Sequence, residues 1–299
     1  MSGSAGAARA SATRTWKLAS DPVASASAHS DVSIVIPAWG DYAGTRLDEA
    51  LASLRGQDLQ ARIVVVDNAS DPPLDVPGVT VVRSGERLSV GAARNLGLAR
   101  VDTPYVLFWD ADDLMLPGTL RFLRNTIADH DDAVLVAAAI LEGDPPVPHR
   151  WPRRWIYPLT RWQRTFAVAH CVWSLFPTTG ASIMRTQAAR EHGFSDANSG
   201  EDWVLGVSLA FRGRVLLKTR PGRLYRRHAT SLWETQHSGR QLVRNAAIVR
   251  ARIRVDAGAL RGTTLLLPVI AILQLLAIWL VRPLVQMMRV IRPMRRSVR

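Results

Sequence analysis

The chain has 299 residues, which is long enough for one large α/β domain with a full core or for two smaller domains. Its single cysteine, Cys171, excludes an internal disulfide framework and is too little to indicate a thiol nucleophile or a zinc site. We therefore expect a packed thiol and a reducing compartment. The formal net charge of +13 is concentrated in residues 240–299, where twelve arginines and one acid give +11.

Apolar runs and helical patterns alternate along most of the chain. Residues 1–30 are rich in alanine and serine and lack the apolar core of a signal peptide, so we expect a disordered arm there. The expected strands are residues 32–37, 63–66, 79–82, 105–109, 133–140 and 215–217. The expected helices are residues 46–54, 92–100, 117–129, 187–192 and 198–211. This alternation predicts a mostly parallel sheet flanked by helices, with a nucleotide crevice at the carboxyl ends of the strands.

The fourth expected strand ends abruptly at the acids Asp110, Asp112 and Asp113. In open α/β sheets, ligands bind outside the carboxyl ends of such strands. Asp110 and Asp112 are separated only by the small Ala111, so both can turn toward a hard cation such as Mg²⁺ or Mn²⁺. The alternative is structural, because Asp112 or Asp113 could cap the N-terminus of the helix that Pro117 opens.

Two further groups of polar residues follow downstream. Glu201 and Asp202 lie at the start of a helical pattern, where the helix dipole stabilises acids, so they could be structural. If the pair faces the same crevice as Asp110, a carboxylate there could instead accept a proton from an attacking hydroxyl. His228 stands next to two arginines and could contact phosphate or a metal ion.

Residues 143–160 are rich in proline, arginine and tryptophan, and we expect no regular structure in them. The aromatic residues in and near this segment are Trp151, Trp155, Tyr157, Trp162 and Trp173. Such side chains can stack on sugar faces, lie at a membrane interface or simply pack the loop. The sequence leaves these three roles open.

The C-terminal part combines arginines with an uncharged stretch. Residues 236–255 form an arginine-rich helical pattern, and residues 262–281 carry no charge. A helix over the second range would rise about 30 Å, enough to cross the hydrocarbon core, although Pro268 and Gln274 interrupt it. A buried core helix and a re-entrant or interfacial helix are the alternatives. Because basic flanks favour anionic lipid head groups, we expect membrane attachment and no nucleic-acid partner.

Taken together and in this order, the motifs resemble those of the family 2 nucleotide-sugar glycosyltransferases of GT-A fold. The matching motifs are VSIVIP at 32–37, VVDNAS at 65–70, GAARNLG at 91–97, FWDADD at 108–113 and GED at 200–202. The resemblance implies an α/β fold with a mixed, mostly parallel sheet flanked by helices. The implied catalytic domain covers residues 31–235, and a basic helical region with membrane-associated helices follows at 236–299.

The resemblance also implies roles for individual residues. The nucleotide sugar would contact Pro37, Ala38, Asp41, Asp67, Asn68, Arg94, Asp110 and Ala111. The metal, Mg²⁺ or Mn²⁺, would be held by Asp112, Asp110 and His228. Asp202, with Glu201 beside it, would act as the base of an inverting transfer.

Departures from the family pattern narrow the expectation. The first loop reads Ala38-Trp39-Gly40-Asp41, without the aromatic-then-asparagine pair often found there, and Asn68 stands in a motif that is commonly Asp-Gly-Ser, so the nucleotide stays open. The acceptor motif of processive synthases, Gln-x-x-Arg-Trp, is absent from the sequence, which favours transfer of a single sugar. We expect a lipid-linked or cell-envelope glycan acceptor and a catalytic domain on the cytoplasmic side of a membrane. The alternatives are a sugar nucleotidyltransferase and a membrane-bound nucleotide-sugar-binding protein without catalytic activity.

Overall fold

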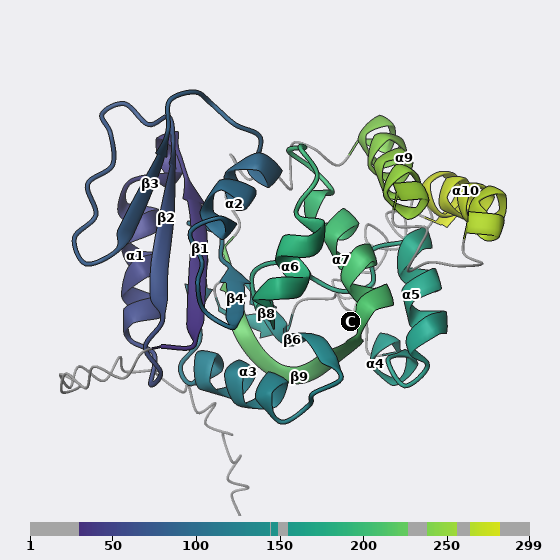
Figure 1. The fold of residues 1–299 in the computed structure, drawn as a ribbon, viewed down its shortest axis with the longest axis horizontal. Coiled ribbons are helices and arrows are strands. Elements are labelled where there is room, and N and C mark those ends of the chain that lie inside the picture. Colours follow the sequence, from purple (N-terminus) through teal and green to yellow (C-terminus); the bar gives the residue numbers. More distant parts are fainter. Residues whose placement is uncertain (1–29, 144, 149–154, 227–237, 256–263, 282–299) are drawn as a thin grey trace, which may run out of the picture.

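A curved, mixed β-sheet lies at the centre of the molecule (Figure 1). The computed structural model describes residues 30–143, 145–148, 155–226, 238–255 and 264–281. The strands are β1 (Val32–Ala38), β2 (Arg62–Asn68), β3 (Thr80–Ser84), β4 (Tyr105–Phe108), β5 (Leu114–Met115), β6 (Ala133–Glu142), β7 (Val147–Pro148), β8 (Ser182–Arg185) and β9 (Arg214–Tyr225). Hydrogen-bonded neighbours follow in the order β3-β2-β1-β4-β8-β6-β9-β5, with β7 beside β6.

Helices cover the sheet and extend beyond it at one end (Figure 1). The α-helices are α1 (Thr45–Arg55), α2 (Val90–Leu98), α3 (Thr119–Ala128), α4 (Ile156–Leu159), α5 (Gln163–Val172), α6 (Thr186–His192), α7 (Glu201–Arg212), α9 (Gly239–Val255) and α10 (Leu267–Leu276). Shorter helical turns are η1 (Gly40–Tyr42), η2 (Thr264–Leu266) and η3 (Ala277–Val281). The mixed α/β class expected from the sequence is thus confirmed.

The first four strands pair in parallel, as the alternating pattern predicts. Strand β1 is buried along its whole length because helices cover both of its faces. Ile34 and Ile36 pack in one apolar cluster with side chains of α1 and α3, whereas Val35 packs in another with those of α2 and α7. Helix α2 lies very close to β1: a Cβ added at Gly97 would sit 2.4 Å from Val35 Cγ1.

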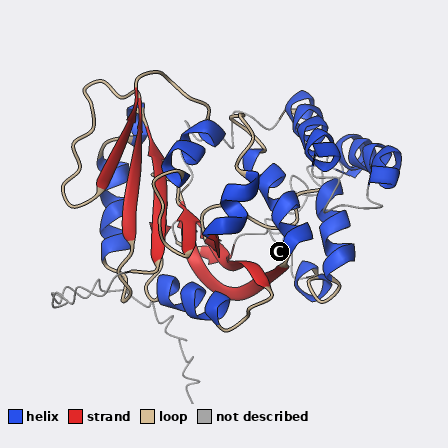
Figure 2. Cartoon of the chain, in the orientation of Figure 1, coloured by secondary structure: helices blue, strands red, loops and turns tan. Residues whose placement is uncertain are grey.

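The second half of the sheet is mixed, because β8 pairs antiparallel with both β4 and β6. Strand β9 curves under the sheet (Figure 2) and pairs in parallel with β6 and antiparallel with β5. It is much longer than the expected strand at 215–217. The middle of β9, residues 219–221, is exposed and includes Arg220, so an apolar run marks only the beginning of the strand. In this longer strand, Arg223 pairs with Met115 of β5.

The structure excludes one alternative and corrects one local expectation. Helix α3 has Gly118 at its N-cap position and follows β5, so Asp112 and Asp113 do not cap it. The segment at 143–160 is not wholly irregular, because β7 pairs with β6 and residues 156–159 form α4. Packing of that loop does not account for Trp155 and Trp162, which are 58% and 64% exposed. Trp151 lies outside the described residues.

The C-terminal helices share an apolar cluster with α5 and α7. Cys171, Trp203 and Val207 from those helices pack with Val249 of α9 and Ile270 of α10. Cys171 is a buried free thiol, as expected. The uncharged stretch at 262–281 forms α10 between two short turns, within the residues that can be described. Among those residues, no helix is both long and apolar enough to cross a bilayer.

Candidate active site

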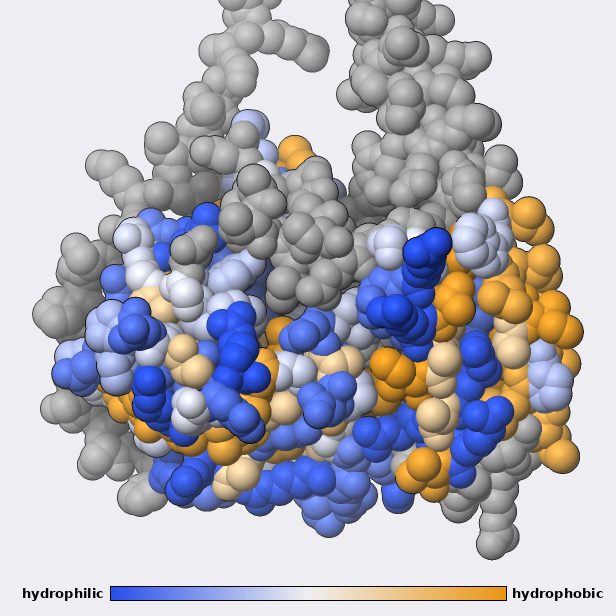
Figure 3. Space-filling model, turned by 90° about the horizontal axis from the view of Figure 1, so that it is seen from above, coloured by the Kyte–Doolittle hydropathy of each residue, from blue (hydrophilic) through white to orange (hydrophobic). Residues whose placement is uncertain are grey.

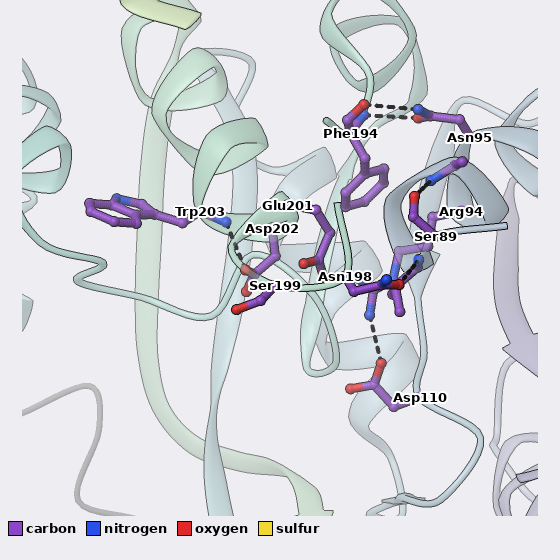
Figure 4. Close-up of polar contacts among 12 residues, drawn as sticks. Ser89, Arg94, Asn95, Asp110, Phe194, Asn198, Ser199, Glu201, Asp202 and Trp203 are labelled. Atoms are coloured by element: carbon purple, nitrogen blue, oxygen red, sulfur yellow. Dashed lines mark hydrogen bonds and ion pairs between the residues drawn. The ribbon is translucent and has the colours of Figure 1, made fainter. Parts of the chain in front are cut away.

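The loops at the carboxyl ends of β1, β2 and β4 meet the N-termini of α2 and α7, and an arginine joins them. The buried side chain of Arg94, from α2, donates from Nη2 to Asp110 Oδ1 at 2.8 Å. Its Nη1 forms an ion pair with Glu201 at the start of α7 (Figure 4). The strand-end acid and the acids of α7, more than ninety positions apart in the sequence, therefore belong to one cluster.

A second arginine, Arg223 from β9, completes this cluster. It donates to Asp110 Oδ2 at 2.7 Å and forms an ion pair with Asp113. Asp113 is fully buried and also accepts the backbone N–H of Arg226 at 2.9 Å. Burial raises the pKa of Asp113 to about 7. Gly180 leaves the space for Arg223, since a Cβ there would lie 1.8 Å from its Nη1, and the φ of Gly180 is +81°.

The acids of the cluster differ in their proton affinity. Burial raises the pKa of Glu201 to about 7, an effect larger than the opposing attraction of Arg94. Burial raises the pKa of Asp202 as well, and the negative charge of Asp110 adds to that rise. Asp110 behaves in the opposite way: although burial alone would raise its pKa, Arg223 and Arg94 hold it below the ordinary value. The site thus combines one firmly ionised carboxylate with carboxyls that can take up a proton near neutral pH.

Of the two α7 acids, Asp202 is the more accessible. Its residue is partly exposed, whereas Glu201 is buried against Arg94. Asp202 Oδ1 accepts the backbone N–H of Trp203 at 2.8 Å, which fixes the carboxylate at the helix N-terminus (Figure 4). The indole of Trp203 donates in turn to the carbonyl of His170 at 2.6 Å, so the first turn of α7 is anchored to α5.

A pocket of about 230 Å³ lies beside this cluster. It is lined by a residue after β1, the last residue of β2, the residues before and at the N-terminus of α2, and the loop before α7: Trp39, Asn68, Arg87, Leu88, Ser89, Val90 and Asn198. The Arg87 guanidinium lies 4.4 Å from the centroid of the Trp39 ring, a cation–π contact that orders the pocket wall. The pocket therefore offers an aromatic face together with amide groups.

Asp67 and Asn68 end β2 but face different surroundings. The fully buried Asp67 carboxylate accepts the backbone N–H groups of Ser70 and Leu74 and pairs with Arg83. Asn68 exchanges two hydrogen bonds with the backbone of Leu88, at 2.8 and 3.0 Å, and lines the pocket. Asp67 thus stabilises the following loop, whereas Asn68 holds the pocket in shape.

The loop before α7 is firmly attached to α2. Asn95 exchanges hydrogen bonds of 2.9 and 2.8 Å with the backbone of Phe194, and Asn198 accepts the backbone N–H of Val90 (Figure 4). No side chain fits at Gly91, because a Cβ there would lie 1.9 Å from the carbonyl oxygen of Ser195. These contacts place Glu201 and Asp202 against the N-terminus of α2.

The loop is also held from the other side by α9. The amide of Asn245 lies 3.0 Å from Ser199 Oγ. A Cβ added at Gly200, whose φ is +76°, would lie 2.6 Å from Asn245 Cγ. The C-terminal helices therefore contact the residues that immediately precede Glu201 and Asp202.

Comparison with known families identifies this arrangement. The sequence profile described as Glycosyl transferase family 2 matches residues 33–193. The chain belongs to glycosyltransferase family 2. The matched residues of the glycosyltransferase include Arg94 and Asp110, whereas Asp202 and Arg223 lie beyond them.

Curated relatives of the glycosyltransferase carry the same activity class in their names. The chain is 30% identical over 185 residues to the pre-mycofactocin glycosyltransferases of two Mycobacterium tuberculosis strains, CDC 1551 / Oshkosh and ATCC 25618 / H37Rv. The aligned region covers 58% of this chain and 38% of each relative. The chain thus spans well under half of the length of these relatives.

Solved structures share the fold of the glycosyltransferase. S. aureus TarS 1–349 in complex with UDP-GlcNAc has a TM-score of 0.58 and 17% identity, covering 74% of this chain and 66% of that one. The complex of the same TarS fragment with UDP has a TM-score of 0.55 and 17% identity, covering 74% and 65%. At this identity the similarity shows the fold, a mixed α/β, GT-A-like architecture.

Five further residues were predicted to contact the nucleotide sugar or the metal, and the structure describes the positions of four of them. Pro37 and Ala38 are buried at the end of β1, and Ala111 is buried after β4. Asp41 lies in η1, but its side chain is not described. His228 falls outside the described residues. The roles assigned to these residues therefore stay predictions.

Sequence reasoning missed Arg223, Trp39 and Arg87 as site residues of the glycosyltransferase. Arg223 carries no motif and belongs to a part of β9 that was not expected as a strand. Trp39 was noted only as a departure from the family pattern, although an aromatic residue directly after β1 could have indicated a stacking surface. Arg87 precedes α2 in a loop whose path the sequence does not specify.

The acids after β4 can be tested for their fit to a divalent cation. Among the residues that the structure describes, no group of three or more His, Cys, Asp or Glu side chains is arranged to hold a metal ion. Mg²⁺ bound to nucleotides, however, commonly takes only one or two protein carboxylates together with phosphate and water oxygens. Asp110 is 28% exposed, and a carboxylate offers about four acceptor sites, so its two arginines leave room for a further partner. Asp112, two residues further along the chain, is largely buried, whereas Asp110 is partly exposed. Asp110 is therefore the carboxylate that could meet such an ion, and Asp112 stays a predicted ligand.

Proposed function

We propose that the protein transfers a single sugar from a nucleotide-diphospho-sugar to a hydroxyl group of a glycan or lipid-linked acceptor, with inversion at the anomeric carbon. The observation that carries this proposal is the partly exposed Asp202, held by the first turn of α7 next to the Arg94–Asp110 pair. Membership of glycosyltransferase family 2 supports the reaction class and favours glycosyl transfer over nucleotidyl transfer.

The nucleoside would bind in the pocket beside the cluster. Trp39 supplies an aromatic face for a base, and Asn68 and Asn198 supply amides at its edge. Asp67 has its carboxylate occupied by the loop that follows β2, so we assign it to shaping the pocket. UDP-sugars are the first donors to test, because TarS, which shares the fold, was solved with UDP-GlcNAc.

Asp110 and Asp112 are the residues that would hold Mg²⁺ or Mn²⁺. His228, the third predicted ligand, lies outside the described residues. When bound, such an ion would stabilise the negative charge of the departing diphosphate as a Lewis acid. Arg94 and Arg223 keep Asp110 ionised and fixed, so that it presents a negative charge at the end of β4.

Asp202 would act as the general base. In the proposed step the acceptor hydroxyl oxygen forms a bond to the anomeric carbon, Asp202 takes the hydroxyl proton, and the nucleoside diphosphate leaves with the electron pair of the broken C–O bond. Attack from the side opposite to the leaving group inverts the configuration. The burial-raised pKa of Asp202 makes it a stronger base than an ordinary aspartate. Glu201 would act through position, since its pairing with Arg94 holds the start of α7.

The acceptor and location are the least specified parts of the proposal. The apolar, arginine-flanked C-terminal region favours a lipid-linked or cell-envelope glycan acceptor at a membrane, with the catalytic domain on its cytoplasmic side.

Product analysis tests the proposed reaction. The full chain is incubated with UDP-, dTDP- and GDP-sugars, Mn²⁺ and a membrane-lipid extract as the source of acceptor hydroxyls, and the released nucleotide and phosphate species are quantified. We expect nucleoside diphosphate from one class of donor. Release of inorganic diphosphate would instead indicate nucleotidyl transfer, and binding without any release would indicate a protein that holds the donor but does not react.

A pair of variants links the activity to the proposed base. Asp202→Asn should bind donor normally, measured by thermal shift, while turnover falls by about 10²-fold or more. Asp102→Asn is the matched control, because that carboxylate is exposed and forms a surface ion pair with Arg62. Full activity of Asp202→Asn would remove the assignment.

A further inference from the structure

Helix α10, together with the turns η2 and η3 at its ends, has one buried side and one exposed side. One row of residues faces the protein: Ile270, Gln274 and Ile278 recur every four positions and are buried. The other side carries bulky apolar side chains that are exposed, namely Leu265, Leu266, Val269, Ile272, Leu273, Leu275, Leu276, Trp279 and Leu280. We call these nine residues the apolar face. It is far more extensive than the isolated exposed apolar residues that soluble surfaces normally carry.

Polar contacts hold α10 flat on the rest of the protein. Gln274 Nε2 donates to the carbonyl of Cys171 at 2.7 Å, and Arg250 of α9 donates to Gln274 Oε1. Ile270 and Ile278 join the apolar cluster formed by α5, α7 and α9. A helix that crossed a bilayer would have to give up this buried row. The apolar face therefore runs parallel to the axis of α10, on the side of the helix that points away from the rest of the protein.

The helix next to α10 carries a row of exposed arginines. Arg240, Arg244 and Arg254 are exposed on α9, and α9 contains no acidic residue. Figure 3 shows apolar side chains gathered at the end of the molecule where α10 lies, beside hydrophilic side chains over α9. Apolar and basic surfaces side by side are the combination that interfacial helices present to anionic membranes.

We propose that the apolar face docks in the plane of an anionic lipid surface, with the α9 arginines contacting the head groups. A second copy of the chain is a poorer occupant, because pairing two apolar faces would bring the arginine rows of both copies together. The proposal specifies how the protein is attached: α10 lies in the interface and does not cross the bilayer. It is independent of the transfer reaction, since docking requires no donor.

Docking in this way would bring the loop before α7 toward the lipid surface, because that loop contacts α9. Helix α9 contacts the loop before α7 through Asn245 and Ser199, directly beside Asp202. A hydroxyl on a lipid-linked acceptor could then reach Asp202 without leaving the membrane surface. This last step depends on the proposed function, whereas the docking itself does not.

Vesicle flotation of the full chain tests the docking. We expect binding to vesicles that contain about one third phosphatidylglycerol, weak binding to pure phosphatidylcholine, and a decrease as salt is added. The variants Ile272→Glu/Leu276→Glu and Arg240→Glu/Arg244→Glu should each lower binding about tenfold or more. Val147→Glu, at an exposed apolar position on β7, is the matched control and should bind as the wild type does.

The depth of Trp279 distinguishes in-plane docking from a span. The fluorescence of Trp279 is obtained as the difference between the wild type and Trp279→Phe. Lipids brominated near the head group should quench this fluorescence more than lipids brominated near the bilayer centre do. Stronger quenching at the centre would overturn the in-plane arrangement. Self-association that Ile272→Glu/Leu276→Glu abolishes, without vesicle binding by the wild type, would assign the apolar face to a second copy. Absence of both vesicle binding and self-association would also overturn the proposal.

Discussion

Replacing Arg94 by methionine should destabilise the protein in a pH-dependent way. Arg94 is the buried cation that joins Glu201 to Asp110, and methionine keeps much of its volume without the charge. Asp110 retains Arg223, so the larger effect falls on Glu201. Removing one partner of a buried ion pair costs about 3–5 kcal/mol when the other partner stays ionised.

The pH dependence follows from the direction of the Glu201 shift. Its pKa is about 7 in the folded protein, against an ordinary value of 4.5 for a solvated glutamate, so the folded form binds the proton more tightly than the unfolded chain does. This carboxyl therefore favours folding at low pH, and that contribution is lost as the pH rises from about 4.5 through 7. Without Arg94 the pKa of Glu201 in the folded protein rises further. Each unit of that rise corresponds to about 1.4 kcal/mol of stability. We expect a loss of about 1 kcal/mol near pH 5.5, where Glu201 is protonated in both proteins. Near pH 8, one unit above the wild-type pKa, the loss grows by about 1.4 kcal/mol, to about 2.4 kcal/mol.

Urea unfolding followed by tryptophan fluorescence at both pH values measures these losses. Arg62→Met is the matched control: its ion pair with Asp102 is exposed, and its loss should cost under about 1 kcal/mol at either pH. Equal losses for Arg94→Met at the two pH values would refute the account, because they would mean that Glu201 does not take up a proton when its partner is removed.

Three further substitutions test the site. Gly180→Ala should displace Arg223 and lower the unfolding free energy by about 1–3 kcal/mol, as followed by urea unfolding, whereas Gly85→Ala, with open space around its Cβ, should be nearly neutral. Trp39→Ala should raise the dissociation constant of the donor about tenfold in calorimetry if that ring stacks on a base, and should lower the melting temperature slightly because its contacts with Arg87 and Tyr42 are lost. Asp202→Asn should lower kcat and leave the donor dissociation constant unchanged, and an equal loss in both would indicate a binding role instead.

The sequence was most informative where each strand is short, apolar and followed by an acid. The strands at 32–37, 63–66 and 105–109 were expected within one or two residues of β1, β2 and β4, because helices on both faces require a continuous apolar run. The same reasoning singled out the acids Asp110 and Glu201, and in the structure both form ion pairs with Arg94.

The missed features depend on distant parts of the chain. Strand β9 was expected only over three residues, since its exposed middle lacks an apolar pattern, and Arg223 near its end was therefore not connected to Asp110. Asp67 was expected to face a nucleotide, but a buried carboxylate takes the nearest backbone donors, here Ser70 and Leu74. The apolar stretch at 262–281 has the length of a span, and only its contacts with Cys171 and the α9 helix show that it lies along the protein.

The contact of Asn245 with Ser199 and Gly200 makes the loop before α7 dependent on α9, which matters when the chain is shortened. Cutting it near residue 236 would keep every proposed donor and base contact described above, yet it would expose Trp203 and leave Ser199 without its neighbour on α9. In such a fragment we expect the N-terminus of α7 to be less well ordered. Helix α9 supports the loop that precedes the proposed base, so any engineered form should retain at least α9.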